Sequence, residues 1–525
     1  MDFENVFIPS DVNGTGFWRM LQPVMTGWSQ GPGTHVRNSV LQKLTVDQNF
    51  YRGASMVMVQ RLTDESGKIL LNQFLKPLGH AFGFWTIYNI DDAMHYNDIP
   101  LYNRGRAAFL GDETQSRIGE MLRESDFILT TTSYIKEYYH RVYGVPLDHI
   151  IALPNLLPRW WAGGLYDRER KERQFVNSKK GKNRPRVGFI SSLSHFNLDD
   201  VHRVKDGSGG AYKTTLPNGA EIWRDDNGNV ISDTSLIERA PDDLDLIEKT
   251  IRETVDDVHW VIMGYTPPSL ADLLQSGKVE YVPSIDIINY PKRLNSLQLQ
   301  AVVAPLQDQE FNRCKSNIKC LECAATGVLL YASDIITYNR FLPPNQLFKT
   351  DGSDLTDKIK HLAYQMSTGA YVSAIERQWR WLNSPADEGD FKLKNWWMED
   401  NFGIWLSLFK MQHKGSTVSF KMFRDTYEKL MAQQKEKSSS GGLKKAAPVD
   451  GKMLDMLKSA LKKRVEEKAN SRDDNAAVAD KSDEAQKEDV PEVESAEWVS
   501  KDGSSTDGTK KTLFENSGHG VKITV

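Results

Sequence analysis

The three cysteines of the chain lie close together, in a stretch that reads FNRCKSNIKCLECAATGVLLYAS from residue 311 to residue 333. Cys314, Cys320 and Cys323 first suggest a metal or redox site. Structural zinc needs four ligands and catalytic zinc three with an open position, yet no histidine lies near these thiols. Cys320 and Cys323 have the spacing of one helix face, where free cysteine packs as a small apolar residue. We therefore interpret the cysteines as packing residues and predict no metal site.

The charged residues of the same stretch indicate a different chemistry. They belong to a predicted helix that starts after the segment 315–317, ends at Gly327 and follows the apolar strand QAVVAP at 300–305. Ligands of open α/β sheets bind outside the carboxyl ends of the strands, and a helix N-terminus attracts pyrophosphate. Lys315 and Lys319 would add positive charge, and Glu322 can accept hydrogen bonds from ribose hydroxyls. On this motif alone, an exposed helix with an ordinary Lys–Glu pair stays open as the alternative.

The composition indicates a globular protein of at least two domains. The chain has 525 residues and a mass of 59.6 kDa, with 39% hydrophobic and 10% aromatic residues, and one compact core does not grow to this size. A net charge of −4 gives no reason to expect a nucleic-acid-binding surface over the whole protein. Few cysteines, no signal-peptide pattern in MDFENVFIPSDVNG and no long apolar run predict a soluble, cytoplasmic protein without a membrane span.

Residues 1–165 show strand-like segments that alternate with helical patterns. Such alternation predicts parallel βαβ units. A helix is expected from Ser133 to the glycine at 144, and another over FWRMLQPV after the turn-rich DVNGTG. The predicted strands are Asn5–Pro9, Ser55–Gln60, Phe84–Ile90, Ser125–Thr131 and His149–Pro154.

A second α/β series follows a charged linker at 166–185 and occupies residues 186–385. Two such halves joined by a linker predict a two-lobed, doubly wound architecture. The insertion at 205–240 carries two Asn-Gly pairs, and NGAEIWRDDNGNVI predicts a β-hairpin, since Asn-Gly favours a type I′ turn. The predicted elements are a helix at Asp242–Val255 and strands at Arg186–Ser191, His259–Met263, Lys278–Val282, Gln300–Pro305 and Gly327–Ala332.

The C-terminal part changes character along its length. Residues 386–434 are predicted to form helices that pack back toward the N-terminal domain, with Trp396, Trp397 and Trp405 as packing residues. Residues 435–525 are rich in Ser, Asp, Lys and Glu, and we predict a mostly disordered tail. Within it, 452–468 has the apolar spacing of an amphipathic helix. The helix is either a contact for a partner or nucleic acid, or a solvated segment of the tail.

The stretch from Asp308 to Gly327 resembles a known motif. Its pattern, Asp-x-x-Phe-Asn-x-x-Lys-Ser-x-x-Lys-x-Leu-Glu-x-Ala-Ala-x-Gly, is similar to the donor-binding motif of GT-B glycosyltransferases, in the large retaining group that uses nucleotide sugars. Other segments of residues 5–410 match the same group in the expected order. They are Ile90–Asp92, Ser125-Asp126 with Thr130–Ser133, Leu153–Asn155, Val187–His195 with Asp199-Asp200, Met263-Gly264 and Tyr290-Pro291.

The resemblance implies the GT-B fold and a glycosyl transfer reaction. Two Rossmann-like doubly wound domains would face a cleft, with the acceptor on the first domain and a UDP- or GDP-sugar on the second. In this class the helix dipole and basic side chains replace a metal at the departing phosphates. The predicted catalytic residues are Asp92, His195, Lys319 and Glu322, and the predicted donor-binding residues are Gly14, Gly16, Ser192, Ser194, Lys315, Ser316 and Asn317.

The sequence departs from the motif of the group at two places. The group has a glutamate eight residues before the ribose-binding one, where this chain has Cys314, and Glu310 is out of register by four. The second domain also opens without the usual Arg and Lys for phosphates, and the available substitutes are Ser192, Ser194, His195 and Lys319. A protein that keeps the fold without catalysis, and docks a partner through its tail, remains an alternative.

The acceptor and the N-terminal side chains are open to more than one interpretation. The resemblance includes glycosyltransferases of bacteriophages, so the acceptor would be a glycan, a protein or a hydroxymethylated base in DNA. Asp92 would contact the acceptor or the transferred sugar, or else would cap a helix ahead of AMHYND. Adjacent aspartates at a strand end are expected to point in opposite directions, so Asp91 is not assigned a role. The loop Gly14–Gly16 is expected to line the cleft.

Overall fold

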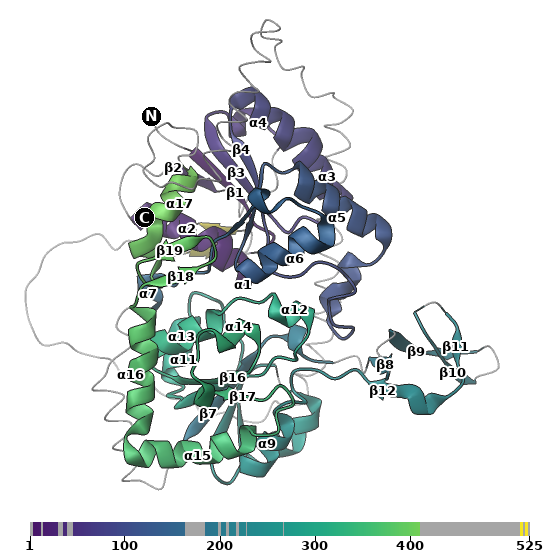
Figure 1. Cartoon of the computed structure of the whole chain (residues 1–525), viewed down its shortest axis with the longest axis vertical. Coiled ribbons are helices and arrows are strands. Elements are labelled where there is room, and N and C mark those ends of the chain that lie inside the picture. Colours follow the sequence, from purple (N-terminus) through teal and green to yellow (C-terminus); the bar gives the residue numbers. More distant parts are fainter. Residues whose placement is uncertain are drawn as a thin grey trace, which may run out of the picture.

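The computed structural model contains two six-stranded parallel sheets, one from each half of the chain (Figure 1). It describes residues 4–11, 14–29, 35–38, 46–162, 184–197, 201–205, 209–216, 220–226, 228–265, 267–409, 515–517 and 520–522. The predicted linker at 166–185, except 184–185, lies outside the described residues, as do the helix at 452–468 and, apart from two short paired strands, the tail at 435–525. Those strands are β20 (Glu515–Ser517) and β21 (Gly520–Lys522).

The first sheet has the strand order β2-β1-β3-β4-β5-β6, with every neighbouring pair parallel. Its inner strands are apolar because helices cover both faces, and all seven residues of β3 are buried. The first edge strand was not expected from the sequence, and the other five lie within the predicted segments or overlap them closely. The strands are β1 (Glu4–Ile8), β2 (His35–Asn38), β3 (Ala54–Gln60), β4 (Trp85–Asn89), β5 (Phe127–Thr130) and β6 (Ile150–Ala152).

Helices connect these strands in βαβ order (Figure 1). The predicted helix α6 begins after Thr132, whose side chain accepts a hydrogen bond from the Ile135 amide, and ends at Gly144 with φ 65°. The helical segments of this domain are α1 (Gly14–Gly16), η1 (Phe17–Leu21), α2 (Gln22–Ser29), α3 (Glu65–Lys68), η3 (Ile69–Leu75), α4 (Lys76–Phe82), α5 (Asp112–Glu124), α6 (Ser133–Tyr143) and α7 (Arg159–Ala162), with 3-10 turns η2 (Gln48–Tyr51), η4 (Arg104–Phe109) and η5 (Leu147–His149).

The second sheet has the order β14-β13-β7-β15-β16-β17 and is also parallel throughout. Its strands are β7 (Arg186–Ser191), β13 (His259–Gly264), β14 (Val279–Pro283), β15 (Ala301–Ala304), β16 (Leu329–Ser333) and β17 (Leu347–Phe348). The helices around it are α9 (Glu248–Thr254), α10 (Ala271–Gln275), α11 (Tyr290–Ser296), α12 (Glu310–Arg313), α13 (Ile318–Thr326), α14 (Ile336–Asn339), α15 (Leu355–Thr368) and α16 (Ala370–Leu382), with 3-10 turns η6 (Leu193–His195), η8 (Pro268–Leu270) and η9 (Pro344–Gln346).

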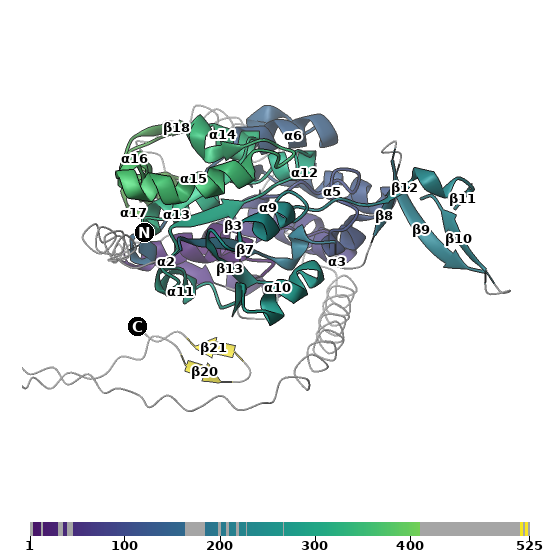
Figure 2. The ribbon, with the colours of Figure 1, turned by 90° about the horizontal axis from the view of Figure 1, so that it is seen from below.

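The insertion forms a five-stranded antiparallel sheet, which we call the inserted sheet. It stands out from the two domains in both views (Figures 1 and 2). The predicted hairpin is present as the pair of β10 and β11. The sequence did not predict the other three strands of this sheet. The strands are β8 (His202–Val204), β9 (Gly210–Thr215), β10 (Glu221–Arg224), β11 (Val230–Ile231) and β12 (Ile237–Arg239), with a 3-10 turn η7 (Thr234–Leu236) before β12.

The C-terminal described segment returns to the first domain. After a hairpin of β18 (Ala386–Glu388) and β19 (Phe391–Leu393), α17 (Met398–Phe409) packs against α2. Trp396, Trp397 and Trp405 are buried there, and the Arg19 guanidinium lies 5.9 Å from the Trp405 ring. The predicted fold class, two doubly wound domains in the GT-B arrangement, is confirmed. No described helix is both long enough and apolar enough to cross a bilayer.

Candidate functional site

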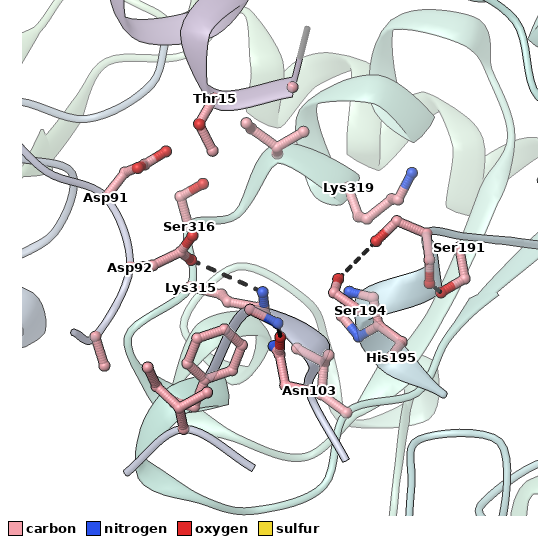
Figure 3. A pocket seen from close by; sticks show the side chains of 18 of the residues that line it. Thr15, Asp91, Asp92, Asn103, Ser191, Ser194, His195, Lys315, Ser316 and Lys319 are labelled. Carbon is pink, nitrogen blue, oxygen red and sulfur yellow. Dashed lines mark hydrogen bonds and ion pairs between the residues drawn. The ribbon is translucent and has the colours of Figure 1, made fainter. Parts of the chain in front are cut away.

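The topological switch points of both sheets, where the strand order reverses, open onto one cavity. In the first sheet the strand order reverses between β1 and β3, and in the second between β7 and β15. Ligands of open α/β sheets bind at such points, beyond the carboxyl ends of the strands. The loops after these four strands line a single cavity of about 570 Å³, which we call the interdomain cavity (Figure 3). This volume lies within the roughly 300–1,000 Å³ range of small-molecule sites.

An arginine and three aspartates form the first-domain wall of the interdomain cavity. The guanidinium of Arg61 lies 3.0 Å from Asp11 Oδ2 and 3.1 Å from Asp92 Oδ2. Arg61 has a left-handed backbone with φ 44°, which is uncommon outside glycine and concentrates at functional sites. The arginine therefore holds two carboxylates at the carboxyl ends of β1 and β4.

Asp91 is the carboxylate of this wall that lacks such a partner. Its side chain is 7% exposed, lines the cavity, and has a buried Oδ1 without a hydrogen-bond partner. Burial, followed by the neighbouring Asp92, raises the pKa of Asp91 to about 7, against the opposing charges of Arg61 and Arg19. Asp91 can therefore accept a proton or a hydrogen bond from a ligand near neutral pH.

Two predictions about this wall were wrong. Asp91 and Asp92 both line the interdomain cavity instead of pointing to opposite sides (Figure 3). The chain leaves β4 in an irregular loop, so the alternation of side chains along a strand no longer applies. No helix follows Asp92 before the 3-10 turn at 104–109, which excludes its interpretation as a helix cap.

The Gly-Thr-Gly segment lies in a helix, where the sequence predicted a loop. Gly14 has φ 47° and lines the interdomain cavity together with Thr15. Gly16 is not in the lining, because its amide donates to Asp11 Oδ1 at 3.2 Å. A Cβ at Gly16 would lie 1.8 Å from the Asp11 carbonyl oxygen, so the small residue permits this close approach.

The loop after β7 supplies hydroxyl groups and an imidazole. Ser192 and Ser194 line the cavity and their hydroxyl oxygens are 2.7 Å apart. His195 also lines it, and its Nδ1 lies 2.6 Å from Asp243 Oδ2. The buried Asp243 also accepts from the Gln307 amide at 2.6 Å, so one carboxylate fixes the imidazole and the loop after β15. Nε2 is then the ring nitrogen left to meet a ligand.

The segment between α12 and α13 completes the second-domain wall. Lys315, Ser316 and Lys319 line the cavity, and Lys315 Nζ lies 3.8 Å from Asp92 Oδ1 of the first domain. The Ser316 hydroxyl accepts a hydrogen bond from Asn155 Nδ2 at 2.9 Å. Both contacts join the two domains at the cavity, so ligand-binding side chains of one domain are held by the other.

Glu322 lies one helical turn behind this wall. It is 4% exposed and does not line the cavity. Its Oε2 lies 2.9 Å from Lys319 Nζ and accepts a hydrogen bond from the Tyr290 hydroxyl at 3.2 Å. Burial, and then Glu322, raises the pKa of Tyr290, so the phenol stays a hydrogen-bond donor. A ligand would reach Glu322 by displacing or sharing Lys319.

Asn317, also predicted to bind the nucleotide sugar, does not line the cavity either. It is the residue before α13, is 4% exposed, and its side-chain nitrogen is buried without a partner. The structure thus places eight of the eleven predicted site residues around one cavity. They are Gly14, Asp92, Ser192, Ser194, His195, Lys315, Ser316 and Lys319.

The cysteines are packing residues, as predicted. Cys314, Cys320 and Cys323 are buried, with at most 2% exposure, and they belong to the apolar cores. Burial raises the pKa of Cys314 and Cys320 well above that of an ordinary thiol, which keeps them unreactive. Across the described residues, no three His, Cys, Asp or Glu side chains are grouped to hold a metal ion.

Sequence reasoning missed several residues of the site. Arg61 and Asp11 come from loops after two different strands, and nothing in their local sequence distinguishes them from other surface charges. Asp243 precedes a helix, a place where aspartate usually has a structural role. Tyr290 was noted only as part of a Tyr-Pro turn. Pairing of the strands, which brings these residues together, is the information that the local pattern lacks.

Several solved structures are similar to this chain in fold, at low sequence identity. No family model and no curated protein matches the sequence. A glycosyltransferase from Rickettsia africae is 10% identical, with 78% of this chain and 98% of that chain covered and a TM-score of 0.47. Sucrose-phosphate synthase from Thermosynechococcus elongatus is 11% identical, with 82% and 100% covered and a TM-score of 0.47. HepE from Anabaena, solved with UDP and glucose, is 8% identical, with 72% and 94% covered and a TM-score of 0.45. Activity and substrates do not follow from likeness at this level.

Proposed function

We propose that this protein is a glycosyltransferase that moves a sugar from a nucleotide-sugar donor to an acceptor hydroxyl. The observation that carries the proposal is the opening of both switch points onto the interdomain cavity. One sheet brings hydroxyls, an imidazole and two lysines to this cavity, and the other brings carboxylates. A negatively charged leaving group and a polyhydroxylated sugar need these two sets of groups on facing walls.

The second-domain wall would hold the nucleotide diphosphate. Lys319 and the hydroxyls of Ser192 and Ser194 line the cavity and would stabilise the negative charge that grows on the departing phosphate. His195, oriented by Asp243 through Nδ1, can donate a hydrogen bond from Nε2 to the same oxygen atoms when the imidazole is protonated on both nitrogens. Glu322 would accept hydrogen bonds from ribose hydroxyls, which would weaken its ion pair with Lys319. The motif resemblance supports UDP or GDP as the nucleotide and retention of the anomeric configuration.

The first-domain wall would hold the transferred sugar and the attacking hydroxyl. Asp92 is already paired with Arg61, so its second role is to hold sugar hydroxyls through the remaining lone pairs. Asp91 also lines the cavity, and its carboxylate would accept the hydrogen bond of the acceptor hydroxyl. This assignment gives Asp91 a role that the sequence alone did not suggest.

A screen of nucleotides by thermal shift tests the proposal. The full chain would be heated with UDP, GDP, ADP, CMP and their common sugar conjugates. A ligand present at about 100 times its dissociation constant should stabilise the protein by roughly 2.7 kcal/mol. We expect UDP or GDP and its sugar conjugates to raise the midpoint. If no nucleotide changes the midpoint at millimolar concentration, the proposed function is wrong.

A further inference from the structure

A second cavity of about 570 Å³ lies where the inserted sheet meets the two domains. Three parts of the chain that are far apart in sequence form its walls. They are the loop after β4 (Asn97–Tyr102 and Arg106), the inserted sheet and its base (Arg203, Gly209, Asp226, Ala240 and Pro241), and the start of α12 with the residue before it (Glu310 and Gln309). The second cavity therefore exists only because residues 201–241 are present.

The two cavities share two walls. Ile99 lines both, while Asn103 and Gly105 of the same loop line the interdomain cavity and Tyr102 and Arg106 line the second cavity. The loop after β15 is divided in the same way. Leu306 and Phe311 line the interdomain cavity, whereas the intervening Gln309 and Glu310 line the second. The two cavities are therefore adjacent, with Ile99 in the lining of both.

The charges of the second cavity are mixed and nearly balanced. The cations are Arg106 and Arg203, and the carboxylates are Asp98, Asp226 and Glu310. Two cations and three carboxylates give a formal sum of −1. Phosphate-rich ligands are bound by an excess of Lys and Arg, which this wall does not offer. The ligand that fits best is uncharged and carries many hydroxyl groups, each able to donate to a carboxylate and accept from an arginine.

The polar groups of the second cavity are held in place before any ligand binds. Asp226 accepts hydrogen bonds from the Gly210 amide at 2.9 Å and from the Tyr212 hydroxyl at 2.7 Å. Arg203 Nε donates to Glu238 at 2.8 Å, and Arg106 Nε donates to the Tyr96 carbonyl at 3.0 Å. Groups that are already oriented lose little entropy when a ligand binds, which favours recognition by hydrogen bonds.

The inserted sheet is anchored at its base, so its wall keeps a fixed position. The Ala240 amide donates to the Val201 carbonyl at 2.8 Å, which closes the two ends of the insertion. Asn197 binds both strands of the base, with Nδ2 2.8 Å from the Val201 carbonyl oxygen and 2.9 Å from that of Ala240. Arg239 then pairs with the buried Asp242 at 2.6 Å.

We infer that the second cavity binds the acceptor, that the acceptor is a neutral oligosaccharide, and that the inserted sheet supplies one of its walls. The inference rests on the proposed function, and it selects a glycan over the modified DNA and protein acceptors that the sequence left open. The acceptor enters between Arg203 and Tyr102 and presents its end to Asp91 and Asp92 beyond Ile99.

Sugar transfer to defined acceptors tests this inference. The full chain would receive the nucleotide sugar selected by the thermal-shift screen, with short neutral glucan, mannan and galactan oligosaccharides, hydroxymethylated duplex DNA or peptides as acceptors. Arg203→Gln and Arg106→Gln should raise the acceptor KM by roughly tenfold or more, since each removes hydrogen bonds from a charged group. The affinity for the nucleotide sugar should not change. Lys213→Gln, on the same inserted sheet but outside the cavity, is the matched control and should leave both constants unchanged.

The outcomes separate this inference from the proposed function. Transfer to DNA or peptide alone would overturn the inference, and so would an acceptor KM that Arg203→Gln and Arg106→Gln leave unchanged. Either result is compatible with the proposed glycosyltransferase function. If no nucleotide sugar binds, saturation-transfer NMR with the same oligosaccharides still reports on the second cavity. Oligosaccharide signals that weaken in Arg203→Gln would then support it, and their absence in the native chain would overturn it.

Discussion

At the scale of single residues, Arg61 decides which carboxylate can meet a substrate. It forms direct ion pairs with Asp11 and Asp92, and so leaves Asp91 as the buried carboxyl group with an unpartnered oxygen. Burying a carboxylate without a hydrogen bond costs free energy, and the cost appears as the raised pKa of Asp91. A carboxyl group with a strongly raised pKa is typical of functional sites, where a ligand supplies the missing hydrogen-bond partner.

Stability should depend on pH through Asp91. Its pKa is about 7 in the folded chain against 3.8 for an ordinary aspartate. Between these values the folded state holds a proton that the unfolded state releases, so the free energy of unfolding falls as pH rises, by up to about 1.4 kcal/mol per pH unit. Asp91→Asn removes this contribution. Urea unfolding at about pH 5 and about pH 8 should show the variant gaining stability relative to the native chain at the higher pH.

The exposed Asp256, whose side chain is 84% accessible, provides the control for this experiment. Asp256→Asn should follow the pH dependence of the native chain. Parallel pH profiles for Asp91→Asn and the native chain would show that Asp91 is ionised in both states, and the role assigned to its unpartnered oxygen would then lose its support.

The predicted residues of the site could be found from local sequence spacing, whereas the missed residues could not. Lys319 and Glu322 lie in one helix and Lys315 lies just before it, so their spacing was visible in the sequence. Arg61 and Asp11 meet only because β1 and β3 are neighbours in the sheet. The role of Asp91 depends on burial by other parts of the fold, which no local pattern contains.

At the scale of elements, two adjacent strands of the second sheet fix the loop that carries Ser192 and His195. β13 pairs with β7 up to Gly264 opposite Ser191. Gly264 has φ 109°, and a Cβ there would lie 2.3 Å from the Ser191 carbonyl oxygen. The glycine therefore permits both the backbone turn and the close approach of the two strand ends at the interdomain cavity.

Gly264→Ala should destabilise the protein more than the same substitution at a left-handed glycine that has open space around it. Gly277 has φ 67° and open space where a Cβ would be, so Gly277→Ala should cost only the backbone strain, roughly 1–2 kcal/mol. At Gly264 the clash adds to this strain, and we expect a loss of about 3 kcal/mol or more. Chemical denaturation of the two variants measures both costs. Equal losses would contradict the packing described at the end of β7.

The apolar strands were predictable because both faces of each sheet are covered. Runs such as 55–60 and 300–305 must be strands of a parallel sheet when helical patterns flank them. Smaller signals were missed or misjudged. The edge strand β2 has little apolar sequence, the Gly-Thr-Gly segment starts a helix despite its composition, and the inserted sheet forms three further strands from polar residues. In these places tertiary contacts outweigh local preference.

At the scale of the whole molecule, one apolar cluster joins the two domains. It includes Phe17 and Trp18 of the first domain together with Met263 and Leu321 of the second. Trp161 lies at the junction, with its ring centroid 4.9 Å from that of Trp18 and 5.5 Å from that of Tyr290. The domains thus share part of their core, which ties the two walls of the interdomain cavity together.

The shared core predicts that the domains unfold together. Differential scanning calorimetry of the native chain should show one main transition. Trp161→Ala should lower the stability by roughly 3–5 kcal/mol and separate the transitions of the two domains. Tyr364→Ala, which removes an aromatic ring that is 60% exposed on α15, should stay close to the native chain. Two separate transitions in the native chain would show that the cluster does not couple the domains.

The measurement that tests the central claim most directly is a thermodynamic cycle between Glu322 and the ribose of the nucleotide. Titration calorimetry would compare UDP or GDP with its 2′-deoxy and 3′-deoxy analogues, on the native chain and on Glu322→Gln. Glu253→Gln, on α9 and outside both cavities, is the matched control. If Glu322 binds the ribose, one analogue should lose roughly 1.5–3 kcal/mol with the native chain and much less with Glu322→Gln. Additive losses, or equal binding of all nucleotides, would contradict a nucleotide-sugar site at Glu322.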